Sequence, residues 1–328
     1  MGNLSSIKKN AGFLLERKLQ SYGLTWKGRS SAAQLSLLEE QPPSELQIVD
    51  LDEYQSLWHA YANHPLSKVA VTDIWYQGTE FKDSLKDINL KKFRGDNAYV
   101  WQLKSHDISS FVISALFAER SDSYGLLTRT REDGDFGAQC IRIGGRLWSR
   151  DLIDSVMEIT FLSDHLPSGS LDSLRIIDVG SGYGRLLHRL ADTTQNATLY
   201  GADGVALSTA ICRAYIRHQD QDARVTVLSL AEVDDFTEDF DLATNVHSFS
   251  EMPLEIVVRW LDWLVERKVR YLFIVPNKPG PALIDGTVFM PQLIERGFEL
   301  VGRREKFDDP LIGKLAFHQN EFYLFARR

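Results

Sequence analysis

The chain has 328 residues, of which 44% are hydrophobic and 25% charged, and its 37 basic and 45 acidic side chains give a formal net charge of −8. This composition is typical of soluble globular proteins and excludes a disordered, collagen-like or coiled-coil chain. The acidic balance disfavours nucleic acid or an anionic membrane as a partner and favours a small-molecule substrate. The length predicts one large domain or two modest ones.

Cys140 and Cys212 are the two cysteines of the sequence. Two are too few for a disulfide framework or a multi-cysteine zinc site, so we expect free thiols in a reducing compartment, the cytoplasm. No apolar run approaches the roughly 18 residues that cross a bilayer. The beginning of the chain also lacks the basic-then-apolar layout of a secretory signal.

The first part of the chain is predicted to be mostly helical, because apolar residues recur there at helical spacing. The predicted helices cover residues 10–24, 30–40, 51–61 and 105–119. Residues 132–145, EDGDFGAQCIRIGG, indicate a hairpin or loop. Ser149 then precedes an amphipathic segment over residues 150–162, as in a capped helix. We therefore expect a mostly helical N-terminal domain, residues 1–148, and a second domain, residues 149–328.

The second domain alternates short apolar strands with helices. Strands are predicted over residues 174–179, 198–202, 225–228, 241–245 and 271–275, and helices over residues 184–192, 206–217 and 254–267. This alternation is typical of a parallel sheet covered on both faces. Residues 298–307 and 322–327 predict two further strands that pair antiparallel at a sheet edge, without a clear helix between them. The fold class is therefore α/β, a Rossmann-like seven-stranded, mostly parallel sheet with an antiparallel last strand.

A glycine-rich loop, DVGSGYG over residues 178–184, follows the first strand of this sheet. Parallel sheets bind ligands at such turns, because glycines let the backbone approach a ligand and the next helix presents unpaired amides. Asp203 ends the following strand about 20 residues on, the spacing at which a carboxylate meets ribose hydroxyls. The pattern indicates a cofactor that carries a ribose.

The loop departs from the pattern of nicotinamide dinucleotide sites. Those sites prefer G-x-G-x-x-G, whereas here Arg185 stands at the third glycine position. Asp178 also places a negative charge where a diphosphate would be repelled and a cationic sulfonium or α-amino group would be attracted. The alternative without a ligand is a tight turn closed by the glycines, with Asp203 capping the next helix.

These residues together resemble the class I S-adenosylmethionine (SAM)-dependent methyltransferases, over residues 150–328 and including the terminal strand pair. Three segments resemble, more narrowly, a family of sugar O-methyltransferases: FRGDNAYVWQ (93–102), SRDLIDSVMEITFL (149–162) and NVHSFSEM (245–252). The resemblance implies SAM as the cofactor. The residues that it implies around the methionine part are Asp178, Gly180, Ser181, Gly182 and Gly184.

The same resemblance implies roles for the next strand ends. Asp203 would hold the ribose hydroxyls, and Asn245 would face the reactive methyl group through its backbone carbonyl. Residues 229–231 would lie near the adenine. Many relatives have an Asp there that this sequence lacks, so the adenine contact stays open.

A sugar hydroxyl is a poor nucleophile until it begins to lose its proton, so an O-methyltransferase benefits from a base whose pKa lies near the working pH. His247 follows the fourth strand and has a near-neutral reference pKa. Glu251 lies four residues later and could orient His247 or act as the base itself if the turn between them is helical. The structural alternatives are a histidine bonded to a loop carbonyl and a carboxylate in the first turn of the next helix.

Four side chains before the boundary are candidates for binding the acceptor: Asn97, Tyr99, Trp101 and Gln102. They combine aromatic faces with polar heads, as in sugar sites or lids, and the alternative is a buried connector between domains. We see no converging set of metal ligands and expect no metal. Trp260 and Trp263 lie three apart on one helix and belong either to the core or to a homodimer interface.

The sequence therefore predicts a SAM-dependent methyltransferase that modifies a hydroxyl of a sugar or glycosylated small molecule, with a mostly helical N-terminal domain shaping the acceptor pocket. Three alternatives stay open. The acceptor could be the nitrogen of an amino sugar or another natural product, the chain could be an idle SAM-binding module, or it could be a nicotinamide oxidoreductase.

Overall fold

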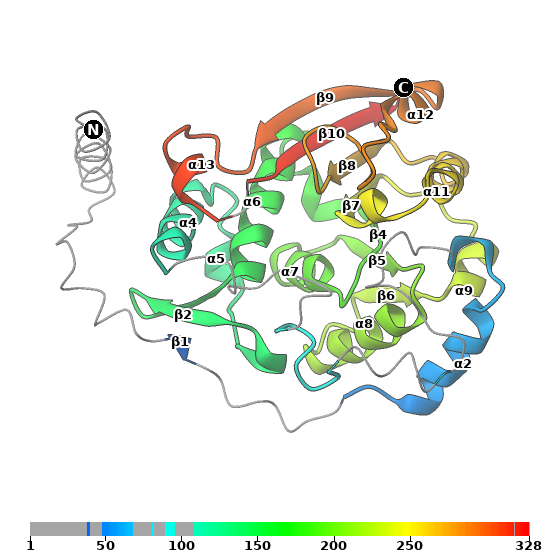
Figure 1. Ribbon diagram of the computed structural model, residues 1–328, viewed down its shortest axis with the longest axis horizontal. Helices are drawn as coiled ribbons and strands as arrows, with labels where there is room; N and C mark the ends of the chain where they lie inside the picture. The colour runs from blue at the N-terminus through cyan, green and yellow to red at the C-terminus, as the bar shows by residue number, and fades with distance from the viewer. Residues whose placement is uncertain are drawn as a thin grey trace, which may run out of the picture.

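The computed structural model describes residues 38–39, 48–67, 81, 89–95, 108–317 and 319–327. Over these residues the chain forms a sheet of seven strands, in the order β6-β5-β4-β7-β8-β10-β9 (Figure 1). The strands are β4 (Arg175–Val179), β5 (Thr198–Ala202), β6 (Val225–Leu228), β7 (Leu242–Val246), β8 (Tyr271–Val275), β9 (Phe298–Glu305) and β10 (Glu321–Arg327).

Strands β4 to β8 pair in parallel, and β10 runs antiparallel to both β8 and β9. The strand order reverses beside β4, because the chain goes from β4 outward to β6 and then returns to β7 on the other side. Parallel sheets bind ligands at the carboxyl ends of the strands at such a switch point. The predicted fold class, including its antiparallel last strand, is confirmed.

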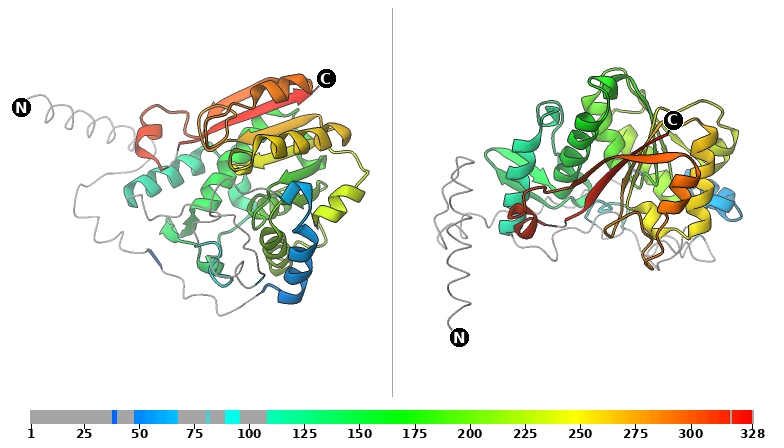
Figure 2. Two further views of the ribbon diagram at one scale, coloured as in Figure 1. Left: turned by 45° about the vertical axis from the view of Figure 1, so that its right-hand side comes forward. Right: turned by 90° about the horizontal axis from the view of Figure 1, so that it is seen from above.

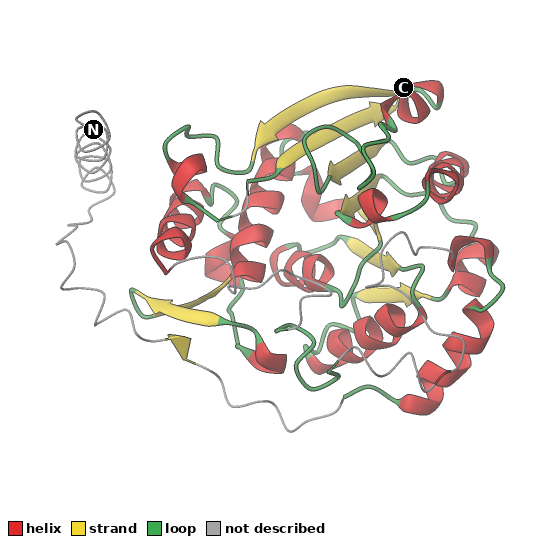
Figure 3. Cartoon of the chain, in the orientation of Figure 1, coloured by secondary structure: helices red, strands yellow, loops and turns green. Residues whose placement is uncertain are grey.

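Helices cover both faces of this sheet (Figures 1 and 3). On one side lie α6 (Arg150–His165), α7 (Arg185–Thr193) and α8 (Ala206–His218), and on the other α9 (Leu230–Asp235), α11 (Leu254–Glu266) and α12 (Met290–Glu295). Two single-turn helices occupy connections, α10 (Ser248–Glu251) after β7 and α13 (Ile312–Leu315) between β9 and β10. The sequence predicted no clear helix at the latter place, where four residues are too few to show a helical period.

Local sequence signals begin and end several of these helices. The Ser149 hydroxyl accepts a hydrogen bond from Leu152 N at 3.0 Å and so begins α6. Ser229 and Glu232 form a reciprocal capping box at the start of α9. Trp260 is fully buried on α11, which favours the core interpretation of that residue over a dimer interface.

The described residues before α6 pack on the α/β unit. Helix α2 (Leu51–Tyr61) lies along α8, while α4 (Ile108–Ser121) lies against α6 and α13 (Figure 2). Strands β2 (Cys140–Ile143) and β3 (Arg146–Ser149) form the expected hairpin. The short elements are α5 (Leu126–Arg129), η1 (Pro65–Ser67), η4 (Asp135–Gly137) and η5 (Ser170–Ser173).

One prediction is wrong in this region. A helix was predicted over residues 30–40, but Leu38–Glu39 form strand β1, which pairs antiparallel with Ile141 and Cys140 of β2. An exposed edge strand offers a row of backbone hydrogen bonds, and pairing with it outweighs a weak helical preference. The helix predicted over residues 10–24 lies outside the described residues.

None of the described helices combines the length and apolar character that a membrane-spanning segment requires.

Candidate cofactor and active site

The glycine loop lies between the end of β4 and the start of α7, at the switch point of the sheet. Gly180, Gly182 and Gly184 have φ values of 74°, 56° and 91°, in the left-handed region that favours glycine. A Cβ at Gly180 would overlap the side chain of Ser248, and one at Gly184 would lie 2.8 Å from Cys212 Sγ. The first and third glycines are therefore required by close packing as well as by backbone conformation.

Two buried carboxylates stand at this edge. Asp178 lies in register with Thr244 on the neighbouring strand β7, and the Thr244 hydroxyl donates to Asp178 Oδ1 at 2.6 Å. Asp203 follows β5 and accepts hydrogen bonds from Gly182 N at 2.9 Å and Val205 N at 2.8 Å. Burial raises the pKa of each carboxyl group to about 7, and the hydrogen bonds only partly oppose this.

These carboxylates make the edge a site for cationic or hydroxyl-bearing ligands. A sulfonium or ammonium would offset the cost of burying a carboxylate, and ribose hydroxyls can donate to one. Asp203 also fixes the glycine loop by accepting from Gly182 N. The alternative role considered for it, capping the next helix, is not what the structure has, because the N-cap residue of α8 is Val205, without a side-chain cap. The residues at this edge fit a SAM-type cofactor.

Asn245 ties the ends of two strands together. Its Nδ2 donates to Val179 O at 2.8 Å and to Ser248 Oγ at 2.6 Å, and its Oδ1 accepts from Phe249 N at 3.0 Å. From the sequence, a role was expected only for the backbone carbonyl of Asn245. The structure adds a buried amide that joins the β7 end to the glycine loop's strand.

His247 lies at the end of β7 with a backbone conformation that non-glycine residues rarely adopt, φ 68° and ψ −35°. Its backbone N donates to Val275 O at 2.7 Å, while its Nδ1 is buried without a hydrogen-bond partner among the described residues. Burial lowers the pKa of the imidazole to about 3, with further lowering by Arg150, Lys306 and Arg185. The near-neutral pKa expected from the sequence is therefore not what the structure has.

Three other residues of this region make contacts within the protein. The turn from Ser248 to Glu251 is helical, yet Glu251 Oε1 accepts a hydrogen bond from Asn277 Nδ2 at 3.0 Å. Arg185 is the first residue of α7, and its Nη1 donates to Glu158 Oε2 of α6 at 2.8 Å. The Ser181 hydroxyl lies 3.9 Å from Cys212 Sγ on α8.

A buried charged group extends from His247 towards α6. Lys306 Nζ lies 2.9 Å from Asp154 Oδ1 and 3.2 Å from Asn320 Oδ1, and Arg150 Nε lies 3.2 Å from Asp154 Oδ2. No local pattern in the sequence indicates this group, because Lys306 is 152 residues from its partner Asp154.

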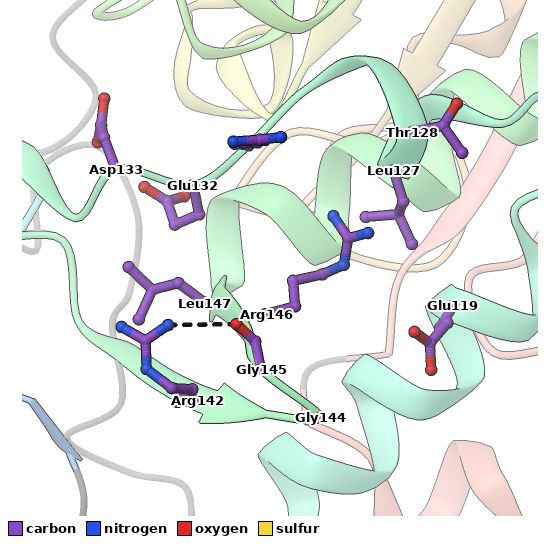
Figure 4. A pocket seen from close by; sticks show the side chains of 11 residues that line it. Glu119, Leu127, Thr128, Glu132, Asp133, Arg142, Gly144, Gly145, Arg146 and Leu147 are labelled. Carbon is purple, nitrogen blue, oxygen red and sulfur yellow. Dashed lines mark hydrogen bonds between the residues drawn. The ribbon is translucent and has the colours of Figure 1, made fainter.

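The predicted acceptor-binding residues Asn97, Tyr99, Trp101 and Gln102 lie outside the described residues. Within the described parts of the chain, no group of three or more His, Cys, Asp or Glu side chains is placed to hold a metal ion. A cavity of about 690 Å³ lies between the β2–β3 hairpin, α5 and the loop at Glu132 and Asp133 (Figure 4). It includes none of the glycine-loop residues.

Residues 176–265 match the family model described as a methyltransferase domain. The chain contains a methyltransferase domain. Its sheet order, with β10 inserted antiparallel between β8 and β9, agrees with the class I methyltransferase fold expected from the sequence, and the residues at the glycine-loop edge fit SAM as the cofactor. No curated protein matches the chain in sequence.

Solved structures similar to this methyltransferase include the magnesium protoporphyrin IX methyltransferase ChlM of Synechocystis PCC 6803 with bound SAM. It is 15% identical with a TM-score of 0.42, over 66% of this chain and 97% of that chain. A SAM-dependent methyltransferase from Aquifex aeolicus is 18% identical with a TM-score of 0.35, over 46% and 81% of the two chains. M. capricolum TrmK with S-adenosylhomocysteine is 13% identical with a TM-score of 0.34, over 50% and 70%.

Proposed function

We propose that the methyltransferase domain transfers a methyl group from SAM to a hydroxyl of a sugar or glycosylated small molecule. The observation that carries the reaction type is that two buried carboxylates and His247, whose Nδ1 has no described partner, all follow strands at one edge of the sheet. The sugar class of the acceptor rests on the three segments that resemble sugar O-methyltransferases. We also propose that residues 1–148 shape the acceptor pocket.

The cofactor would be held by the loop over residues 180–184 and by the two carboxylates. Asp178 would face its cationic part, and Asp203 would accept from the ribose hydroxyls while still binding Gly182 N. When bound, SAM supplies an activated methyl carbon, so the protein needs to align the acceptor oxygen and remove its proton. Asn245 holds the β7 end against β4 and so fixes the place from which His247 acts.

His247 is proposed to accept the hydroxyl proton. Its lowered pKa keeps the imidazole neutral near pH 7, so a ring nitrogen can accept a hydrogen bond from the acceptor hydroxyl. A pKa of about 3 makes the ring a weak base, so for the proton itself to move to His247 this pKa has to rise when the acceptor is bound. The rare backbone conformation is costly, and such strain clusters at functional sites. Glu251 is proposed to orient His247 or to act as the base itself, while its Oε1 accepts a hydrogen bond from Asn277 Nδ2.

The first test is calorimetric titration of the full chain with SAM and, in parallel, with NAD. We expect SAM to bind and NAD not to bind. Asp203→Asn keeps one acceptor for Gly182 N and should weaken SAM about tenfold, whereas Asp203→Ala also leaves two amides unpaired and should weaken it further. Binding of NAD alone would replace this function with the oxidoreductase alternative.

The second test separates O-methylation from the alternatives. Sugars, glycosides and amino sugars are incubated with the protein and SAM, and release of S-adenosylhomocysteine is measured. For a hydroxyl acceptor, His247→Ala should lower kcat about 100-fold or more. A fall of less than threefold would favour a nitrogen acceptor, and SAM binding without turnover on any acceptor would favour the idle binding module.

A further inference from the structure

A buried charged cluster lies directly behind the glycine loop, and neither the sequence analysis nor the proposed reaction accounts for it. Its centre is Arg94, whose side chain is fully buried. The cluster also contains four acidic or basic side chains from three other segments: Glu132, Asp133, Asp151 and Arg189. Only a specific function or a specific geometry explains why a fold would keep so many charges out of water.

All the nitrogens of the Arg94 guanidinium are used. Its Nη2 donates to both carboxylate oxygens of Glu132 at 2.8 and 2.9 Å, its Nη1 donates to Asp133 Oδ1 at 2.8 Å, and its Nε donates to Asp151 Oδ2 at 3.1 Å. Lysine could not reproduce this arrangement, because a single ammonium nitrogen lacks the planar set of three donor nitrogens with which Arg94 reaches three carboxylates at once.

Asp151 connects Arg94 to the glycine loop. The same Oδ2 that accepts from Arg94 also accepts a hydrogen bond from the Tyr183 hydroxyl. Tyr183 is the residue between Gly182 and Gly184, and its side chain is buried. The loop is thus held from two sides, since Gly182 N binds Asp203 at the ligand edge and Tyr183 binds Asp151 behind it.

The charges of the cluster support one another. Burial by itself would lower the pKa of Arg94, but Glu132, Tyr215, Tyr183 and Asp151 raise it above its usual range, so the guanidinium stays charged. Glu132 has a lowered pKa although burial opposes this, because Arg94 and Arg189 favour its ionised form. Glu132 and Asp133 also line the cavity of Figure 4, so this cavity borders the cluster.

We propose that Arg94 is a positioning residue for the cofactor: it holds Asp151 where the Tyr183 hydroxyl needs it and so keeps the glycine loop in the conformation that binds SAM. This inference rests on the proposed function. Residues 93–102 resemble sugar O-methyltransferases and include Asn97, a candidate for binding the acceptor. With Arg94 three positions earlier, the same segment would also position the cofactor loop.

The test compares two tyrosines that share one environment. Tyr183 and Tyr215 are both buried, and their rings form an edge-to-face pair with centroids 5.1 Å apart. The Tyr183 hydroxyl donates to Asp151 and so holds the glycine loop, whereas the Tyr215 hydroxyl lies 2.8 Å from His188 Nδ1 on α7. Tyr183→Phe and Tyr215→Phe therefore remove one buried hydroxyl each and differ in whether the glycine loop is released.

We expect Tyr183→Phe to raise the Kd for SAM about tenfold and Tyr215→Phe to leave it within twofold, while both lower the Tm by similar amounts. Arg94→Lys should raise the Kd as Tyr183→Phe does, and the double variant should be no weaker than the worse single one, because both act through Asp151. Equal losses of affinity in the two tyrosine variants, or no loss in Tyr183→Phe, would overturn the proposal.

The wild-type titration separates this outcome from a failure of the function. If the wild-type chain does not bind SAM, the proposed function itself fails. If the wild-type chain binds SAM and Tyr183→Phe binds it equally well, only the role of Arg94 is lost. Should Arg94→Lys not fold, an unchanged Kd for SAM in Tyr183→Phe would still overturn the proposal.

Discussion

At the scale of single residues, the cofactor edge is defined by buried carboxylates that carry no ion pair with a cation on the described residues. Asp178 has a threonine hydroxyl as its partner and Asp203 has two backbone amides. Such partners stabilise an ionised carboxylate less than a guanidinium would, and burial therefore prevails and raises both pKa values to about 7. A cationic ligand would supply the positive charge that stabilises the ionised form of these carboxylates.

This arrangement predicts that SAM binding releases protons. In the free protein each carboxyl group is half protonated near pH 7, and a cation or a donating hydroxyl favours the ionised form. The Kd for SAM should therefore fall as pH rises from about 6 to about 8, by at most about tenfold per pH unit for each group. Titration at pH 6.5 in two buffers of different ionisation enthalpy should give different heats.

Asp178→Asn is the control for that measurement, since it removes one titrating group and should reduce both the pH slope and the proton release. Binding heats that do not depend on the buffer would contradict the prediction. The same pKa values determine whether the stability of the ligand-free protein rises or falls with pH. Because the folded-state pKa lies above the unfolded one, this contribution to stability is complete below about pH 4 and is lost as pH rises through about 7.

His247 has the opposite linkage. Its folded-state pKa of about 3 lies below that of an unfolded histidine, near 6.5, because the folded chain buries the ring among cations. The unfolded chain then binds the extra proton between these values, so this contribution to stability is present above about pH 6.5 and is lost as pH falls towards 3. His247→Gln should weaken the acid sensitivity of the Tm below pH 6.5, and an unchanged acid limb would contradict this assignment.

At the scale of elements, the connection from β4 to α7 depends on close approach to the turn after β7. Gly180 combines a positive φ with a Cβ position that Ser248 fills, whereas Gly169 has a nearly equal φ of 73° and open space. The two glycines therefore separate the cost of backbone strain from the cost of crowding. This crowding joins the glycine loop to the segment that carries His247.

We expect Gly180→Ala to lower the free energy of unfolding by more than 2 kcal/mol and to abolish SAM binding, while Gly169→Ala costs about 1 kcal/mol and leaves SAM affinity unchanged. Urea denaturation and calorimetric titration measure the two quantities. The double variant Gly180→Ala with Ser248→Gly should regain part of the stability, because the second change removes the overlapping atoms. Equal effects at Gly169 and Gly180 would show that crowding is unimportant.

At the scale of the whole molecule, segments far apart in sequence share one hydrophobic core. Buried residues from α2, α4, α6 and all seven strands of the large sheet belong to a single cluster. Tyr61 of α2 is a clear junction, because its hydroxyl lies 3.1 Å from Thr209 Oγ1 on α8 and accepts from Leu230 N of α9 at 3.0 Å. Burial raises the pKa of Tyr61 to about 12, so it stays a neutral phenol.

Tyr61→Phe should therefore lower the free energy of unfolding by about 1–3 kcal/mol, since it leaves the Leu230 amide without its partner. The expected unfolding curve by circular dichroism stays a single transition. Ser56→Ala changes the exposed side of the same helix, where the Ser56 hydroxyl binds Asp52 O, and should stay within about 0.5 kcal/mol of wild type. An unchanged free energy of unfolding in Tyr61→Phe would mean that these hydrogen bonds of Tyr61 do not stabilise the fold.

The sequence by itself determined the strands and helices of the α/β unit and the place of its glycine loop. Apolar strands of four to five residues, such as Thr198–Ala202 and Val225–Leu228, end at turn residues on both sides, and α6 begins at the serine that caps it. These are local signals, because hydrophobic period, caps and glycine positions act within a few residues. These local signals do not predict the edge strand β1, because β1 is stabilised mainly by its pairing with β2.

Only the tertiary structure decided which charges meet and what they do to one another. The described carboxylate partners of Arg94 stand 38, 39 and 57 positions away in the sequence. The low pKa of His247 and the high ones of Asp178 and Asp203 likewise come from burial and from neighbours on other elements. Desolvation and Coulomb interactions depend on distance in space, which no local pattern in a single sequence encodes.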